Sequence, residues 1–174
     1  MTKHVLKTER LTLRPLRSSD AEAMMALAGD ADVARMTARI PHPYSLDQAK
    51  DWIARAIQSN EVVFAIVHQG ALIGCVGYMP EENTSAEVGS WIGKPHWNKG
   101  FATEAARAVA EHAFASGDIR TLTAGHFTDN PASARVLEKL GFTHSGEGQW
   151  GCVARGEDVP CMLFRLERAG LRAP

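Results

Sequence analysis

Residues 97–105 read Trp97-Asn98-Lys99-Gly100-Phe101-Ala102-Thr103-Glu104-Ala105 and follow an apolar run, Val88 to Ile92. The apolar run predicts a strand, and the pattern from Ala102 to Ser116 predicts a helix, so the nine residues predict a strand-to-helix turn. A helix start offers unpaired backbone N–H groups and a positive dipole end, and Gly100 lets a ligand approach without meeting a Cβ. The turn therefore predicts a phosphate or pyrophosphate site. An ordinary structural turn is the alternative that these residues leave open.

The bulk properties of the chain restrict the classes of protein to which it can belong. Its 174 residues are 45% apolar and 22% charged, and its net charge is −1. These values predict a single globular domain over residues 1–174, without the basic excess of a nucleic-acid-binding protein. No apolar stretch approaches the roughly 20 residues of a membrane span, so we expect no membrane partner.

The N-terminus and the cysteines predict a cytoplasmic location. Residues 1–4 lack the apolar core of a secretory signal. Cys75, Cys152 and Cys161 are odd in number and irregularly spaced, which argues against a disulfide framework and suits a reducing compartment.

Periodicity and capping patterns predict the elements around the turn. Apolar runs and alternation predict strands at residues 10–16, 62–68, 72–79, 86–92, 121–127, 142–148 and 160–166. Helix-start patterns at Ser19–Glu22, Ser45–Gln48 and Asn130-Pro131 predict three more helices. Residues 30–43 predict a loop with one helical turn around Asp32 to Met36. This order predicts a mixed α+β (α/β) domain with a mostly antiparallel sheet.

The glycine-rich motif and the histidine spacing argue against a dinucleotide-binding enzyme and a metal enzyme. Gly146-Glu147-Gly148-Gln149-Trp150-Gly151 matches G-x-G-x-x-G, but residues 152–160 do not continue as a helix, so we predict a glycine-rich hairpin region. A Rossmann-type oxidoreductase is therefore a weak alternative. The seven histidines lack metal-ligand spacing, so we expect no metal, and we interpret His96 and His126 as structural residues.

The order W-x-K-G-F-A-T-E-A resembles the acetyl-CoA pyrophosphate loop of the GNAT N-acetyltransferases. Trp97 stands where many members have Gln or Arg. In having Trp at this position, the chain resembles the RimJ/RimL branch. The resemblance extends over Thr8–Leu16 with Asp20, Glu87–Ile92 and Asn130–Phe142. It implies a GNAT-like fold, a mostly antiparallel, twisted mixed sheet flanked by helices, with acetyl-CoA as co-substrate.

The resemblance also implies roles for individual residues. The pyrophosphate would lie on the turn, at Trp97, Asn98, Lys99, Gly100, Phe101, Ala102 and Thr103. The strand at Trp91 and Ile92 would bind the pantetheine amides with its backbone, and Asn130 would contact the CoA arm. As an N-cap, Asn130 also has a structural explanation.

Acetyl transfer to an amine requires a proton acceptor, and the resemblance assigns that role to Glu87. An outward-facing strand carboxylate is the alternative. The resemblance places Ser133 near the CoA sulfur, although a first-turn serine also has a structural explanation. Leu137 stands where many members have a Tyr that protonates the thiolate, so Ser133 or water must replace that acid.

The acceptor amine stays open at this level. The RimJ/RimL resemblance suggests a protein α-amine, such as that of a ribosomal protein, while a small-molecule amine is the alternative. We expect residues 30–43 and 150–158 to select the acceptor. A homodimer also stays open. A non-catalytic acyl-CoA sensor is the alternative function, and Glu87 favours the enzyme.

Overall fold

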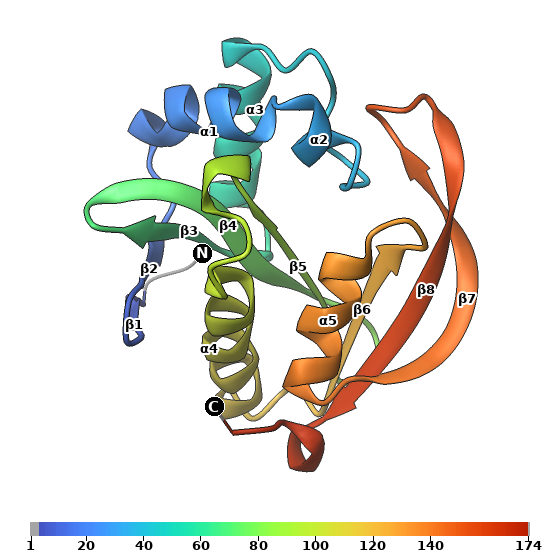
Figure 1. Cartoon of the computed structure of the whole chain (residues 1–174). Helices are drawn as coiled ribbons and strands as arrows, with labels where there is room; N and C mark the ends of the chain where they lie inside the picture. The colour runs from blue at the N-terminus through green and yellow to red at the C-terminus, as the bar shows by residue number, and fades with distance from the viewer. Residues whose placement is uncertain (1–3, 174) are drawn as a thin grey trace.

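A computed structural model describes residues 4–173, which form an eight-stranded sheet flanked by helices (Figure 1). The strands are β1 (Leu6–Lys7), β2 (Thr12–Pro15), β3 (Val62–His68), β4 (Ala71–Pro80), β5 (Ser85–Ile92), β6 (Thr121–Phe127), β7 (Thr143–Cys152) and β8 (Glu157–Glu167). The α-helices are α1 (Ala21–Ala28), α2 (Ala31–Ala34), α3 (Leu46–Gln58), α4 (Phe101–Ala115) and α5 (Pro131–Leu140). Short 3₁₀ turns are η1 (Ser18–Asp20), η2 (Lys94–His96) and η3 (Arg168–Gly170).

The sheet has the order β1-β2-β3-β4-β5-β6-β8-β7. Only β5 and β6 pair in parallel, so the prediction of a mostly antiparallel mixed sheet is confirmed. The parallel ladder covers only Ser85–Glu87 against Thr121–Thr123. Beyond it the two strands separate into a V, which is visible between their labels in Figure 1. Among residues 4–173, no strand therefore pairs with this edge of β5 from Val88 onward.

The two faces of the sheet bury different cores. Alternation along β5 places Ala86 and Ile92 in the cluster formed with α4, and Trp91 against the cluster formed with α1 and α3. The central strand β4 lies close to both of its neighbours because Gly74, against β5, and Gly77, against β3, lack side chains. A Cβ at Gly74 would lie 2.2 Å from the Trp91 carbonyl oxygen, and one at Gly77 would lie 2.3 Å from that of Val62. The close pairing of these strands holds β5 in place where it leaves β6.

Several local predictions are confirmed by hydrogen bonds. Ser45 Oγ accepts from the Gln48 N–H at 3.2 Å, and Gln48 Oε1 accepts from the Ser45 N–H at 2.9 Å, which completes the capping box of α3. Asn130 Oδ1 caps α5 by accepting from the Ser133 N–H at 3.2 Å, with Pro131 at the first position. Gly141, at φ 97°, ends α5 as expected.

One local prediction is wrong: the helix α1 forms, but the capping box expected at its start does not. The helix start at Ser19 is replaced by η1, and α1 begins at Ala21 without a side-chain cap. The reason is that the Asp20 carboxylate accepts from Arg14 Nη1 and Nη2 at 2.8 and 2.7 Å and from the Arg17 N–H at 2.8 Å.

The glycine-rich residues 146–151 lie within β7, and the turn falls at residues 153–156. The strand β7 is at the edge of the sheet, and its Cys152 and Trp150 pack in the cluster that contains Phe127. No helix follows the G-x-G-x-x-G match, so the rejection of a dinucleotide fingerprint is confirmed.

No helix within residues 4–173 is long and apolar enough to cross a membrane. The three cysteines are buried thiols. In the same part of the chain, no cluster of three or more His, Cys, Asp or Glu is arranged to hold a metal ion.

Candidate active site

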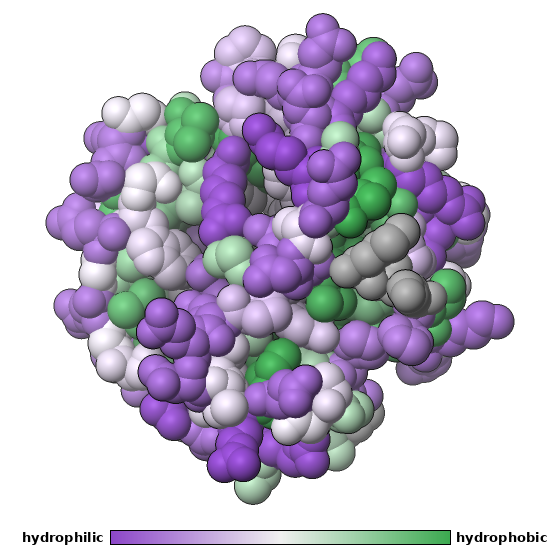
Figure 2. Space-filling view, turned by 180° about the vertical axis from the view of Figure 1, so that it is seen from behind, coloured by the Kyte–Doolittle hydropathy of each residue, from purple (hydrophilic) through white to green (hydrophobic). Residues whose placement is uncertain are grey.

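A cavity of about 1050 Å³ occupies the V between β5 and β6. Its walls come from β5, the first turn of α4, the end of β6 and the exposed side of α5, with α3 and the residues before it on the other face of the sheet. Figure 2 shows a hollow on the face opposite that of Figure 1, bordered largely by hydrophilic residues. Most of the residues predicted from sequence line this cavity, namely Glu87, Trp91, Ile92, Trp97, Asn98, Gly100, Phe101, Ala102, Thr103, Asn130 and Ser133.

The turn before α4 presents a row of unpaired donors. None of the six backbone N–H groups from Asn98 to Thr103 has a hydrogen-bond acceptor within residues 4–173, whereas Trp97 and Glu104 on either side are both bonded. Asn98 and Gly100 have φ values of 60° and 80°, which curl the backbone into a concave nest. A Cβ at Gly100 would meet only the Arg10 guanidinium, at 3.3 Å. This geometry fits a pyrophosphate group.

Arg10 holds this turn from the opposite end of the sequence. Its Nη1 donates to the Lys99 carbonyl oxygen at 2.9 Å, and its Nε donates to Glu104 Oε2 at 2.7 Å. Its guanidinium lies 4.7 Å from the centroid of the Phe101 ring. Thr8 Oγ1 and the Arg10 N–H also donate to Glu104 Oε1, at 2.6 and 2.8 Å. Burial alone would raise the pKa of Glu104, but these hydrogen bonds hold it below its ordinary value.

Two further contacts fix the turn to the strand that precedes it. Trp97 Nε1 donates to the Ile92 carbonyl oxygen at 2.7 Å, and Lys99 Nζ donates to the Pro95 carbonyl oxygen at 3.0 Å. The Lys99 ammonium is thus directed back onto its own loop. The exposed backbone of β5 lies at Gly89 and Ser90, just before Trp91 and Ile92.

Glu87 lies at the apex of the V. It is opposite Thr123 in the last pair of the β5–β6 ladder and is half-buried. Burial raises the pKa of Glu87 above the ordinary value of glutamate. Arg39 opposes this rise, while Glu81 and Glu61 add to it. A carboxylate whose pKa is shifted toward neutrality is better matched to accept a proton.

Ser133 and Asn130 lie across the cavity from Glu87, at the start of α5. The Ser133 backbone N–H is used by the Asn130 cap, whereas its hydroxyl makes no hydrogen bond within residues 4–173. That hydroxyl is free to contact a ligand in the cavity. Leu137, one turn later, is buried among apolar residues and offers no donor.

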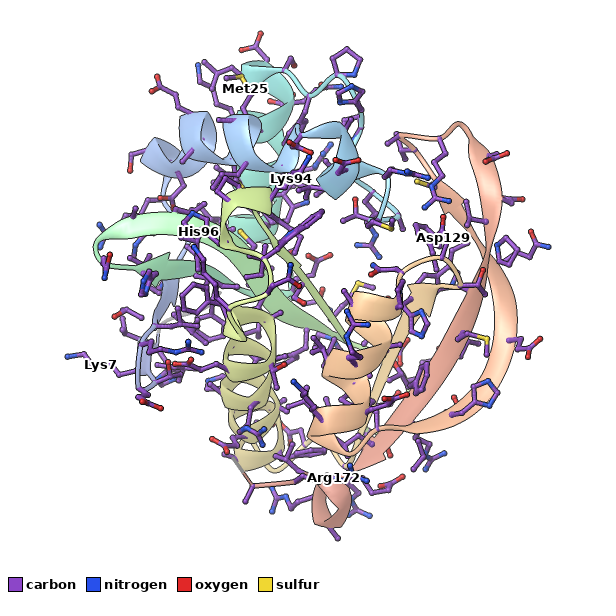
Figure 3. The ribbon with its side chains drawn as sticks, in the orientation of Figure 1. Lys7, Met25, Lys94, His96, Asp129 and Arg172 are labelled. Carbon is purple, nitrogen blue, oxygen red and sulfur yellow. The ribbon has the colours of Figure 1, made fainter. Side chains whose placement is uncertain are left out.

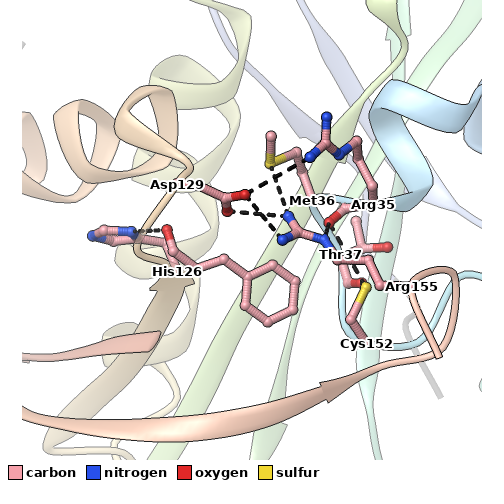
Figure 4. A network of polar contacts seen from close by, with 8 residues as sticks. Arg35, Met36, Thr37, His126, Asp129, Cys152 and Arg155 are labelled. Carbon is pink, nitrogen blue, oxygen red and sulfur yellow. Dashed lines mark hydrogen bonds and ion pairs between the residues drawn. The ribbon is translucent and has the colours of Figure 1, made fainter. Parts of the chain in front are cut away.

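A polar cluster closes the far wall of the cavity (Figure 4). Arg155, in the β7–β8 turn, donates to both carboxylate oxygens of Asp129 at 2.9 and 3.0 Å, and through Nε to the Arg35 carbonyl oxygen at 2.8 Å. Its guanidinium also lies 5.1 Å from the Phe127 ring centroid. The Val153 N–H adds a bond to the Ala38 carbonyl oxygen at 3.0 Å. The two segments predicted to select the acceptor are therefore joined.

Glu61 and Asp129, which the sequence interpretation left out, also line the cavity, together with residues of the two segments predicted to select the acceptor. Arg39 and Glu61 form an ion pair at 3.6 Å and both line the cavity, as does Trp150 of β7. His96 and Asp129 lie on opposite sides of the gap in Figure 3. His126 is buried, with Nδ1 2.7 Å from the Phe127 carbonyl oxygen, as expected of a structural residue.

Comparisons with known proteins agree with this geometry. The family profile described as acetyltransferase (GNAT) domain matches residues 10–143. The N-acetyltransferase p20 of Bacillus licheniformis is 30% identical over 92% of this chain and 94% of its own length. The ribosomal-protein-serine acetyltransferase of Escherichia coli K12 is 31% identical over 57% of this chain and 61% of its own length.

Among solved structures, the chain is similar to RimL, a ribosomal L7/L12 α-N-protein acetyltransferase in complex with coenzyme A. The TM-score is 0.82 at 18% identity, and the match covers 94% of this chain and 98% of that one. At this identity the likeness concerns the fold alone, and it includes the open mixed sheet.

Proposed function

The chain belongs to the GNAT family of acetyltransferases, and on that premise we propose that it moves the acetyl group of acetyl-CoA to a primary amine at the apex of the V. The single observation that carries this proposal is the row of six unpaired N–H groups from Asn98 to Thr103 beside the cavity that contains Glu87. Anion binding and a proton acceptor are the two capacities that such a transfer requires.

The residues that would hold acetyl-CoA are spread along the cavity. The backbone N–H groups of residues 98–103 bind the pyrophosphate, and the unpaired edge of β5 accepts the pantetheine arm beside Trp91 and Ile92. Asn130, at the start of α5, contacts the same arm. Acetyl-CoA supplies an activated acetyl thioester to this site.

The protein groups then assist a direct transfer. The amine nitrogen attacks the thioester carbonyl carbon, the C–N bond forms and the C–S bond breaks. Glu87 accepts the proton that the nitrogen loses, directly or through water. The Ser133 hydroxyl donates a hydrogen bond to the departing sulfur, because Leu137 cannot. No cysteine nucleophile takes part, since Cys75, Cys152 and Cys161 are buried.

The acceptor is either a protein α-amine or a small-molecule amine. The protein α-amine is supported by the names of the Escherichia coli relative and of RimL, which are both ribosomal-protein acetyltransferases. The experiment that decides is incubation of the protein with acetyl-CoA and a panel of amines. The panel contains N-terminal peptides of ribosomal proteins, polyamines, amino acids and aminated drugs, and mass spectrometry detects the product. Binding of acetyl-CoA without acetylation of any amine would favour the acyl-CoA sensor.

A further inference from the structure

Gly89 is a strand glycine that packing does not explain. A Cβ at Gly89 would meet no atom of residues 4–173 within 4 Å, and the residue is not in the left-handed region. By contrast, a Cβ at its partner Gly77 or at Gly125 would lie 2.3 Å from another atom. Glycine in a strand interior costs conformational entropy and side-chain packing. Packing within the sheet therefore does not require glycine at residue 89, and the effect of the missing side chain is to leave the adjacent cavity space open.

That space lies on the same face of β5 as the candidate base. Alternation places Glu87, Gly89 and Trp91 on one face, opposite the face that packs on α4. In the ladder with β4, Gly89 pairs with Gly77, so the backbone of two adjacent strands is bare between the Glu87 carboxylate and the Trp91 indole. Gly89 is exposed just beyond the point where β5 leaves β6, although its partner Gly77 on β4 is buried. The result is a slot in the floor of the cavity.

The rest of the cavity combines aromatic rings with carboxylates. Trp52 of α3 and Tyr44 before it line it, and Trp150 covers Gly125 on β6. Glu61 lines the same cavity and adds a second carboxylate to it. Aromatic faces and carboxylates together suit a cation that has an apolar body.

We propose that Gly89 is a specificity-determining residue for the acceptor amine, and that its missing side chain admits a slender stem between Glu87 and Trp91. The proposal rests on the proposed acetyltransferase function. The substrate class is a primary amine on an unbranched or planar apolar stem, with the nitrogen at Glu87 and the stem toward Trp91. Four strand residues span about 13 Å, which is room for a stem of that kind.

The test measures amine binding and does not depend on turnover. The protein is saturated with CoA and titrated calorimetrically with n-hexylamine, 2-phenylethylamine and the compact branched tert-butylamine. For the wild type we expect the first two amines to bind more tightly than the third. In the series Gly89→Ala, Gly89→Val and Gly89→Leu, we expect the Kd of the first two to rise stepwise, by roughly ten-fold or more for leucine. The Kd of acetyl-CoA, titrated separately, stays within about two-fold. The pyrophosphate turn is untouched, and the pantetheine arm pairs with the backbone edge of β5, whereas a side chain at residue 89 projects from the face of the sheet.

Two control variants separate occupancy of the slot from damage to the fold. Gly146→Leu places the same side chain on the edge strand β7, outside the segments predicted to select the acceptor, where the nearest atom to a Cβ is Leu163 Cδ1 at 4.0 Å. It leaves amine binding unchanged. Gly77→Ala lowers the Tm, because its Cβ would meet the Val62 carbonyl oxygen, whereas Gly89→Ala does not.

Three results would overturn the proposal. Gly89→Leu binds hexylamine as the wild type does, or it loses acetyl-CoA and amine affinity together, or neither slender amine binds the wild type. The amine-panel assay tests the proposed function separately, so its failure is recognised by an absence of acetylated product whatever the slot binds.

Discussion

Glu87 and Thr123 form the last residue pair of the parallel ladder between β5 and β6, and the cavity begins directly beyond them. The point at which the sheet splits is therefore also the point at which a half-buried carboxylate enters the cavity. The backbone that Val88–Ile92 would otherwise pair with β6 is left for a ligand. The same residue pair therefore marks the opening of the sheet and the position of the proposed proton acceptor.

Gly100→Glu is expected to abolish acetyl-CoA binding. Its Cβ would lie 3.3 Å from the Arg10 guanidinium that holds the turn, and its carboxylate would add a negative charge beside the N–H groups that bind the pyrophosphate. The matched control is Gly117→Glu at the other end of α4, because Gly117 has a similar φ of 85° and open space around its Cβ. Both variants carry the same backbone strain, so calorimetric titration isolates the effect on the ligand. Equal acetyl-CoA affinity in the two variants would place the cofactor elsewhere.

The pH dependence of kcat/KM should follow the charges around Glu87. Glu87 acts when deprotonated, and its pKa is raised, so activity is lost as the pH falls through that raised value. Arg39 lowers the pKa of Glu87 and Glu61 raises it. Arg39→Gln should therefore move the acid limb of the profile to higher pH, and Glu61→Gln should move it to lower pH.

A control for these shifts is Glu147→Gln, since Glu147 is an exposed carboxylate on β7. The acid limb of the kcat/KM profile of Glu147→Gln should coincide with that of the wild type. If both Arg39→Gln and Glu61→Gln moved the acid limb in the same direction, the acid limb could not be assigned to the ionisation of Glu87.

Ser133→Ala should lower kcat by up to about ten-fold, which corresponds to one lost hydrogen bond to the sulfur. Its Tm should not change, because the backbone N–H of residue 133 still donates to Asn130 and the hydroxyl has no partner in the described part of the chain. Leu137→Tyr should not raise kcat, since Leu137 is buried in the core. Initial rates and thermal unfolding are measured together, and a fully active Ser133→Ala variant would leave water as the only acid.

Arg155→Met should raise the KM for the acceptor and leave the Kd of acetyl-CoA unchanged. The substitution keeps the bulk of the side chain but removes its bonds to Asp129 and Arg35, which join the acceptor-side segments. The stability cost should be about 1 kcal/mol or less, because Asp129 is exposed. Arg165→Met, which breaks an exposed pair with Glu167, is the matched control. An unchanged acceptor KM would leave the cluster without a role in acceptor binding.

Local sequence patterns were sufficient for most elements, because capping residues and alternation act within a few positions. Thr121–Phe127 and Val62–His68 have the predicted bounds, and the Ser45 and Asn130 caps form as expected. The one failure is the capping box at Ser19. It does not form because the Asp20 carboxylate pairs with Arg14, at the end of the preceding strand, and accepts from the Arg17 N–H.

The candidate site was predictable only where its residues are neighbours in sequence within one motif. The turn at residues 97–105 is continuous in sequence, so its anion-binding character is readable from residue types. Arg10 and Glu104 are 94 positions apart, and Arg155 and Arg35 are 120 apart. Contacts over such separations depend on the topology of the sheet and leave no local pattern. The slot at Gly89 is likewise visible only when the Cβ environment of each glycine is known.

The most direct test of the proposed account is the pH–rate profile of Glu87→Gln with an amine found in the acceptor panel. Gln keeps the shape of the side chain and loses the proton acceptor, so turnover at neutral pH should fall by about 10- to 1,000-fold. Acetyl-CoA affinity should stay the same, and the loss should shrink at high pH, where more of the amine is already neutral. Wild-type rates at every pH would contradict the account and make Glu87 a structural residue.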